Sequence, residues 1–220
     1  MPDSLGVAVL ASGSGTNLQA IIEQLHEDPG SGVEVVRIIG SRAGIGALAR
    51  AERHRILTAV QPAGTQSGDW LLGELDACGA RLVVLAGWLR LISPAVVRAF
   101  RGRMINIHPA LLPSFGGPGM YGRHVHEAVV ASGVRGSGAT VHFVDEVYDH
   151  GAIIAQWPVP VMEEDDAEAL AARVLKVEHR LLPAVVRAYA AGTFELGDSG
   201  HVEWKGAWFE GDAFSIVRGS

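Results

Sequence analysis

The sequence predicts an α/β fold with a mostly parallel central sheet, flanked by helices and followed by a C-terminal antiparallel extension. Two observations lead to this prediction. Short, β-branched and nearly continuous apolar runs recur along the first half of the chain, which is typical of strands buried on both faces. Helix-like segments lie between these runs, for example at residues 18–25 and 46–53. This alternation indicates parallel strands covered on both sides.

The expected strands follow in chain order. Four apolar runs precede residue 110, and they read LGVAVLAS (5–12), VEVVRIIGS (33–41), RLVVLAG (81–87) and MINIHP (104–109). After Gly138 the pattern changes, because GATVHFV and AIIAQWPVPV follow each other closely as two strands. A long helix is then expected from about residue 165 to 191, and the stretch 201–216 resembles a terminal hairpin.

Composition favours one well-packed domain. The chain has 220 residues, 48% of them hydrophobic, and no low-complexity linker divides it. Its formal net charge of -6 is spread without a basic block, which argues against a nucleic-acid surface but does not identify a substrate.

Cys78 is the only cysteine, so an intrachain disulfide and a cysteine metal site are excluded, and a reducing cytoplasm is expected. No apolar run could span a bilayer, and the first residues, MPDSLG, do not resemble a signal peptide.

A glycine-containing loop, ASGSGTNLQA, connects the first strand to a helix that begins near Leu18. Backbone N–H groups and the helix dipole can hold a phosphate at such a place. The dinucleotide fingerprint would need a third glycine where Leu18 stands, and the second strand is followed by Ser41 and Arg42 instead of an acidic residue. A phosphate monoester therefore fits the loop better than NAD does.

The side chains of this loop allow two interpretations. Gly13 and Gly15 permit close approach of the backbone, and Thr16 and Asn17 can add side-chain donors and cap the helix. The alternative is a simple glycine turn with an asparagine cap, which the loop alone fits about equally well.

Two polar residues stand at the end of the fourth apolar run. Asn106 and His108 are two positions apart, so they share one face of the strand, and Pro109 ends it. An amide donor beside an imidazole suits the stabilisation of an oxyanion and the movement of a proton. The alternative is structural, because a strand-end asparagine is often a turn former and a neighbouring histidine often only hydrogen-bonds.

Two acidic features have structural default interpretations. Asp149 lies in VYDHGA, between the two later strands, where an exposed turn residue is the default. The four acidic residues at 163–166 precede the long helix and suit its positive end, so we interpret them as a helix start and not as a metal site.

Several motifs together resemble the phosphoribosylglycinamide formyltransferase family, folate-dependent enzymes of purine synthesis. The motifs are LASGSGTNLQAI, VVLAGWLRLISP, NIHPALLPSF and GATVHFVDEVYDHGAIIAQ. The resemblance runs from about Val7 to Tyr189, and it is specific because the motifs agree in order over most of the chain. It implies one Rossmann-like formyltransferase domain over residues 1–220, with a ribonucleotide phosphate-binding half (1–100), a catalytic and folate-binding half (101–190) and a C-terminal hairpin extension (191–220).

The resemblance also implies a role for individual residues. The catalytic residues would be Asn106, His108 and Asp149. The phosphate of glycinamide ribonucleotide would lie on Gly15, Thr16 and Asn17, and its ribose on Glu178. The pterin of 10-formyltetrahydrofolate would be flanked by Trp88, Leu89, Arg90, Leu91 and Ile92.

Glu178 lies beside apolar positions of the predicted long helix. On helical spacing Val174, Val177 and Leu181 form the core stripe, and Glu178 borders that stripe. A ligand role is therefore compatible with its position. Lys176 points elsewhere and is left out of the site.

The implied reaction moves a formyl group from 10-formyltetrahydrofolate, a co-substrate, to the amine of glycinamide ribonucleotide in de novo purine (IMP) synthesis. Attack of the amine creates an oxyanion that Asn106 and protonated His108 can meet. Asp149 would keep His108 charged, and a water between them could carry the proton. No metal is required.

Three other functions are weighed against this one. A methionyl-tRNA formyltransferase would usually need a further C-terminal domain, and a formyltetrahydrofolate hydrolase would usually carry an additional N-terminal one. A non-catalytic folate or nucleotide-binding module is the third, and its metal-binding variant rests on histidines whose spacings match no zinc pattern: His124, His126, His142, His150 and His179. The expected partners are small-molecule substrates, without nucleic acid or membrane, and a homodimer is left open.

Overall fold

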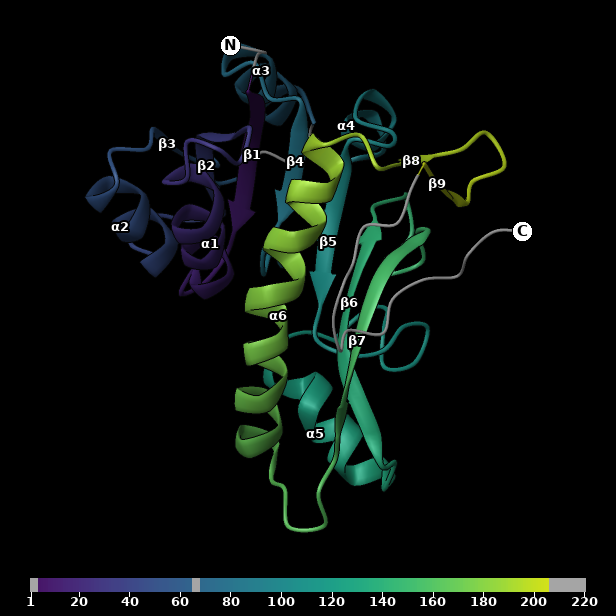
Figure 1. Ribbon diagram of the computed structural model, residues 1–220. Helices are drawn as coiled ribbons and strands as arrows, with labels where there is room; N and C mark the ends of the chain where they lie inside the picture. Colours follow the sequence, from purple (N-terminus) through teal and green to yellow (C-terminus); the bar gives the residue numbers. More distant parts are fainter. Residues whose placement is uncertain (1–3, 65–67, 206–220) are drawn as a thin grey trace. The chain divides into compact units, whose positions relative to one another are not determined.

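The computed structural model of the protein describes residues 4–64 and 68–205 (Figure 1). These residues form two compact units, and the division falls between Asn106 and Ile107. Each unit is described by itself below.

The first unit contains a parallel sheet. Its strands are β1 (Leu5–Ala11), β2 (Val33–Gly40), β3 (Thr58–Val60), β4 (Leu82–Leu85) and β5 (Met104–His108), in the order β3-β2-β1-β4-β5. The last two residues of β5 belong to the second unit. All four neighbouring pairs are parallel. β1 is central, and its residues from Val7 to Ala11 are fully buried. The predicted parallel strands are therefore confirmed, and the short edge strand β3 is an addition to them.

The helices of the first unit follow the predicted alternation. They are α1 (Thr16–Ile21), the π-helical turn η1 (Ile22–His26), α2 (Gly46–Arg53), α3 (Asp69–Ala77) and α4 (Pro94–Ala99). The helix expected at residues 18–25 is thus α1 continued by η1, and the one expected at 46–53 is α2. α2 packs on β2 and β3, and η1 packs on β2. Ser93 caps α4, with Pro94 at its first position.

The second unit contains the antiparallel pair β6 (Gly136–Phe143) and β7 (Ile153–Pro160). Helix α5 (Arg123–Ser132) packs on α6 (Ala167–Ala190), and α6 also lies along both strands (Figure 1). The two closely spaced strands and the long helix are confirmed. α6 places the side chains of Leu170, Val174 and Leu181 in a core from which water is excluded.

The acidic run before α6 is a helix start, as predicted. The carboxylate of Asp166 accepts a hydrogen bond from the backbone N–H of Ala169 at 2.8 Å and so caps the helix. Asp165 instead accepts from the guanidinium of Arg173, at 2.9 Å, and from the backbone N–H of Met162, at 2.8 Å. The run therefore holds the first turns of α6 in place.

The C-terminal hairpin lies within the predicted extension 191–220, but its first strand precedes the stretch 201–216. Strands β8 (Phe194–Leu196) and β9 (Val202–Trp204) pair antiparallel, and β9 lies in the described part, 201–205, of the expected stretch. Residues 206–216 of that expected stretch lie outside the described residues. The first strand escaped notice because it is only three residues long and follows α6 almost directly. Phe194 anchors it, with its ring centroid 4.9 Å from that of Trp204 and 5.8 Å from that of Tyr189.

Within the described residues, no helix combines the length and the apolar character needed to cross a membrane.

Candidate active site

Strand β5 carries Asn106 and His108 at its end, as predicted. The strand stops at His108, immediately before Pro109. His108 is 3% exposed, whereas Asn106 is half-buried. Alternate residues of a strand point to the same side, so the amide and the imidazole share one face.

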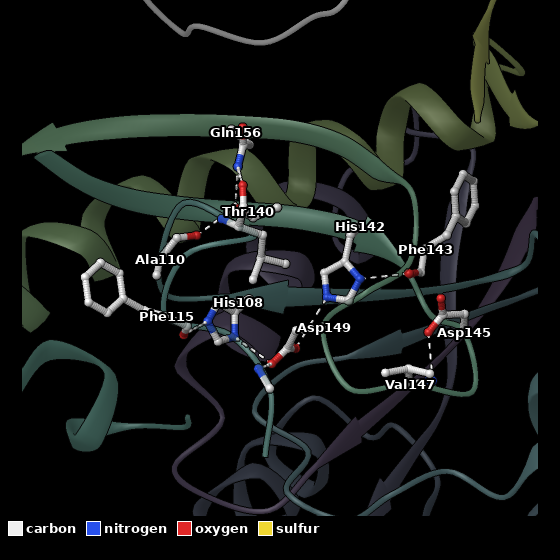
Figure 2. A network of polar contacts seen from close by, with 12 residues as sticks. His108, Ala110, Phe115, Thr140, His142, Phe143, Asp145, Val147, Asp149 and Gln156 are labelled. Carbon is white, nitrogen blue, oxygen red and sulfur yellow. Dashed lines mark hydrogen bonds and ion pairs between the residues drawn. The ribbon is translucent and has the colours of Figure 1, made fainter. Parts of the chain in front are cut away.

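Asp149 lies in the turn between β6 and β7 with a positive φ of 54°. Its carboxylate faces two imidazoles: Oδ2 is 3.5 Å from Nδ1 of His108, and Oδ1 is 3.7 Å from Nε2 of His142 (Figure 2). Oδ2 also accepts a hydrogen bond from the backbone N–H of Gly117 at 2.9 Å. The structure thus brings Asp149 to His108, although the sequence alone made an exposed turn its default interpretation.

The outer nitrogen of each imidazole is held by a main-chain carbonyl. Nε2 of His108 lies 2.8 Å from the carbonyl oxygen of Phe115, and Nδ1 of His142 lies 2.7 Å from that of Phe143 (Figure 2). A carbonyl oxygen only accepts hydrogen bonds, so each of these nitrogens carries a hydrogen. In each ring the other nitrogen faces Asp149.

Burial dominates the protonation of His108. Burial lowers the pKa of this imidazole, the charge of Asp149 and the hydrogen bond to Phe115 oppose the fall, and the net result is a pKa below its usual range. Burial raises the pKa of Asp149, but the interaction with the imidazole of His142, the charge of His108 and the N–H of Gly117 outweigh burial and lower that pKa. The pair therefore combines a carboxylate with an imidazole that is mainly neutral at pH 7.

This result corrects one expectation. We predicted that Asp149 keeps His108 charged, and that expectation is wrong because the loss of hydration on burial outweighs the attraction of the carboxylate. A neutral imidazole with Nε2–H has a lone pair on Nδ1, so His108 is available as a proton acceptor.

Two polar residues of the second unit were not predicted. Oγ1 of Thr140 donates to the carbonyl of Ala110 at 2.6 Å and accepts from the N–H of Leu112 at 3.1 Å (Figure 2). The side-chain amide of Gln156 donates to the carbonyl of Leu112 at 2.9 Å. These bonds tie the segment after β5 to β6 and β7. Thr140 and His142 alternate on a buried strand, and that polar alternation was the available signal.

The first loop packs closely against the start of α2. Gly15 has a φ of 75°, and a Cβ on it would lie 2.7 Å from Cα of Ala47. Conversely, a Cβ on Gly46 would lie 2.8 Å from the carbonyl oxygen of Ser14. The loop and the start of α2 therefore touch through their main chains, and larger residues would separate them.

The expected side-chain cap of α1 is not formed. Gly15 is the N-cap residue, and no side chain of the described residues makes a capping hydrogen bond there, so the assignment of Thr16 and Asn17 as caps is wrong. A left-handed glycine satisfies the turn instead. The guanidinium of Arg50, which sequence reasoning missed, donates to the carbonyl of Ser14 at 2.9 Å and brings a positive charge to the loop.

The segment from Trp88 to Ile92 follows β4 and mixes buried and exposed apolar side chains. Trp88 and Ile92 are buried, whereas Leu89 and Leu91 are 50% and 57% exposed. Arg90 donates to the side chain of Gln61 at 2.9 Å. In the part of the chain that the structure describes, the buried indole N–H of Trp88 has no hydrogen-bond partner.

Glu178 lies inside the buried stripe of α6. It is 7% exposed, and Val174 and Leu181 on the same face are fully buried, whereas Val177 is only half-buried. The predicted stripe is therefore rotated slightly: Glu178 belongs to it and does not merely border it. Lys176 is exposed.

Among residues 4–64 and 68–205, no group of three or more His, Cys, Asp or Glu side chains is arranged to hold a metal ion.

Comparison with known proteins identifies the family. Residues 5–186 match the family described as formyl transferase. The chain therefore belongs to the formyl transferase family, and the match runs through both compact units.

Three similar proteins show which members of this family the chain resembles. A solved structure of phosphoribosylglycinamide formyltransferase from Anaplasma phagocytophilum is 35% identical, with a TM-score of 0.84 over 92% of this chain and 94% of that one. The chloroplastic phosphoribosylglycinamide formyltransferase of Vigna unguiculata is 43% identical over 83% of this chain. The trifunctional purine biosynthetic protein adenosine-3 of Gallus gallus is 40% identical over 90%. The chain spans 60% of the Vigna protein and 20% of the Gallus protein.

Proposed function

We propose that this chain transfers the formyl group of 10-formyltetrahydrofolate to the amine of glycinamide ribonucleotide, a step of purine synthesis. The observation that carries the proposal is the placement of the Asp149 carboxylate 3.5 Å from Nδ1 of His108, at the end of a strand that also carries Asn106. The names of the similar proteins supply the acceptor, the family supplies the reaction class, and the resemblance of the sequence motifs supplies the formyl donor.

The transfer begins with attack of the amine nitrogen on the formyl carbon. A C–N bond forms, the carbonyl oxygen becomes an oxyanion, and the attacking nitrogen acquires a positive charge. The side-chain amide of Asn106 donates a hydrogen bond to the oxyanion. Removal of one such donor from an enzyme costs about 3 to 4 kcal/mol of transition-state stabilisation.

His108 and Asp149 then move the proton. Nδ1 of the neutral imidazole accepts the proton of the attacking nitrogen, and the carboxylate of Asp149 stabilises the resulting imidazolium. The proton passes to the folate nitrogen as its bond to the formyl carbon breaks, which releases tetrahydrofolate and returns His108 to its neutral form. This assignment replaces the charged resting His108 of the sequence-based expectation.

The binding roles belong to the same proposal. Gly15, Thr16 and Asn17 hold the phosphate of the ribonucleotide through backbone N–H groups, supported by the position of the loop at the start of α1 and the nearby charge of Arg50. The half-exposed leucines and the buried indole N–H in the segment Trp88 to Ile92 suit a flat heterocycle such as the pterin.

Four further assignments belong to the same proposal. The buried carboxylate of Glu178 suits a ribose hydroxyl. The functional division into a phosphate-binding half and a catalytic half stays a prediction. So do a cytoplasmic location and a homodimer.

The decisive experiment supplies both substrates and follows the release of tetrahydrofolate. We expect release only when glycinamide ribonucleotide is present, together with formylated ribonucleotide in equal amount. Release without the ribonucleotide would favour a formyltetrahydrofolate hydrolase. Tight binding of folate or ribonucleotide without turnover would favour the non-catalytic module.

A further inference from the structure

The segment from Phe115 to Gly117 contacts both members of the proton-transfer pair. Its first residue accepts a hydrogen bond from Nε2 of His108 at 2.8 Å, through the main-chain carbonyl. Its last residue donates its N–H to Oδ2 of Asp149 at 2.9 Å. One short piece of main chain thus holds an imidazole with its carbonyl and a carboxylate with its amide.

We propose that this segment is a main-chain clip that positions His108 and Asp149, and that Gly116 is the positioning residue within it. The inference rests on the proposed function for its catalytic consequence, but its structural content can be tested without substrates. The side chains at 115 and 117 do not make the two bonds, so no motif of side-chain chemistry reveals the clip.

Gly116 lacks the Cβ that the clip could not accommodate. A Cβ there would lie 2.6 Å from Cδ2 of Leu112 and 3.1 Å from Cβ of Asp149. Leu112 is buried, so the packing around its side chain limits how far Cδ2 can move. The added atom would therefore push the clip away from Asp149 or move Asp149 itself. The φ of Gly116 is not in the left-handed region, so alanine at this position tests the contact and not the backbone conformation.

The clip determines which imidazole nitrogen can accept a proton. With Nε2–H committed to Phe115, the lone pair of the neutral ring is on Nδ1, the nitrogen that faces Asp149. Two titratable groups of the described residues shift the pKa of this ring, Asp149 from the β6–β7 turn and His142 from β6. The ring in turn lowers the pKa of His126 in α5. If the clip opened, neutral His108 could carry its hydrogen on either nitrogen, and part of the population could no longer accept a proton on Nδ1.

The first test uses the unaltered protein. Nitrogen-15 NMR of histidine-labelled protein at pH 8, with the His108 signal assigned by comparison with His108→Gln, reports which ring nitrogen carries the hydrogen. We expect the Nε2–H tautomer almost exclusively. A neutral His108 with its hydrogen on Nδ1, or an even mixture of tautomers, would overturn the clip.

The second test compares two glycine-to-alanine variants. Gly116→Ala should produce a mixture of His108 tautomers and lower kcat about tenfold or more, with the KM for the ribonucleotide nearly unchanged, because a displacement of about 1 Å suffices for such losses. Gly136→Ala is the control, because a Cβ there meets no atom of the described residues within 4 Å and its φ is not in the left-handed region. A Gly116→Ala protein with the native tautomer and native kcat would contradict the proposal.

The two readouts separate this inference from the proposed function. If the protein shows the Nε2–H tautomer but does not formylate the ribonucleotide, the clip stands and the proposed function is refuted. If the protein formylates the ribonucleotide with His108 in the other tautomer, the proposed function stands and the clip is refuted. If Gly116→Ala does not fold, the tautomer of the unaltered protein still decides.

Discussion

His108 experiences two opposing influences, and their balance determines what it can do. Burial in the second unit disfavours the imidazolium, whereas the carboxylate of Asp149 favours it. Each unit of pKa corresponds to about 1.4 kcal/mol between the two protonation states. A ring that rests neutral beside a carboxylate can accept a proton and have the new charge stabilised immediately, which suits a base that must also return the proton.

Replacement of Asp149 by asparagine should separate catalysis from binding. We expect Asp149→Asn to lower kcat by about two orders of magnitude or more while the KM for the ribonucleotide stays nearly unchanged, because the imidazolium formed during proton transfer loses its counter-charge. Steady-state kinetics with both substrates measures this. Asparagine tolerates the positive φ at this position, so the fold should be retained.

The matched control is Asp145→Asn in the same turn region. Asp145 is half-buried, and its carboxylate accepts a hydrogen bond from the N–H of Val147 and pairs with His150 at 2.9 Å. Its kcat should stay close to the unaltered value. An Asp149→Asn protein that turns over as fast as this control would contradict the proposed mechanism.

At the scale of elements, the first loop and α2 depend on contact between their main chains. Gly15→Val should raise the KM for the ribonucleotide about tenfold or more but change the KM for the folate little, because its side chain would collide with Ala47 and displace the N–H groups proposed to hold phosphate. Gly44→Val is the control, since Gly44 has a nearly equal φ of 74° but no atom of the described residues within 4 Å of a Cβ. Equal effects of Gly15→Val on both KM values would count against the phosphate assignment.

The start of α6 offers a test of stability alone. Asp166→Ala removes the cap that binds the N–H of Ala169 and should lower the free energy of unfolding by about 1 kcal/mol. Glu163→Ala removes an equal charge from an exposed neighbour outside the cap position and should cost less. Urea denaturation of both variants provides the measurement. Equal losses would show that charge near the helix end, and not the cap, provides the stabilisation.

The elements could be predicted where the hydrophobic pattern was long and regular. β1, β2, α2 and α6 fall near the expected residues because each shows a clear period. β3 is three residues at a sheet edge, and α5 follows a glycine-rich loop, so neither gave a comparable signal. The clip could not be predicted from the sequence for another reason. Its hydrogen bonds use backbone atoms, which are present whatever the sequence is.

The site was predictable only in part, for a related reason. The shared strand face of Asn106 and His108 followed from the period of one strand, whereas the pairing of Asp149 with His108 required the family resemblance, since the two residues are far apart in sequence. The protonation of His108 depends on burial, which adjacent residues do not reveal. Three-dimensional packing therefore overturned the expected charge, while the expected proximity of His108 and Asp149 is confirmed.

For the whole molecule, the shifted pKa values predict loss of stability in acid. The pKa values of His108 and His126 are lowered in the folded state. Their contribution to the stability of the fold is therefore complete above the pKa of the unfolded chain, near 6.5, and is lost as the pH falls through the pKa values of the folded state. The lowered pKa of Asp149 acts in the same direction below about pH 3.9. Urea unfolding should therefore give a free energy that declines steadily from pH 7.5 to pH 4.

Variants identify the origin of this decline. His108→Gln should flatten the decline between pH 7 and pH 5, because the buried group that resists protonation is gone. His201→Gln, at an exposed position, should leave the decline as it is. A protein that is more stable at pH 5 than at pH 7.5 would show that the folded state favours protonated histidines, contrary to the lowered pKa values of His108 and His126.

The positive φ of Asp149 restricts how this position can change during evolution. Among residues with a side chain, asparagine, aspartate and histidine are the ones enriched in left-handed backbone, and glycine adopts it freely. Glutamate would keep the charge but fit the turn poorly, whereas asparagine or glycine would fit the turn but abolish the charge. Aspartate alone meets both demands. A lineage that keeps this chemistry therefore cannot replace Asp149 through an intermediate residue that preserves activity.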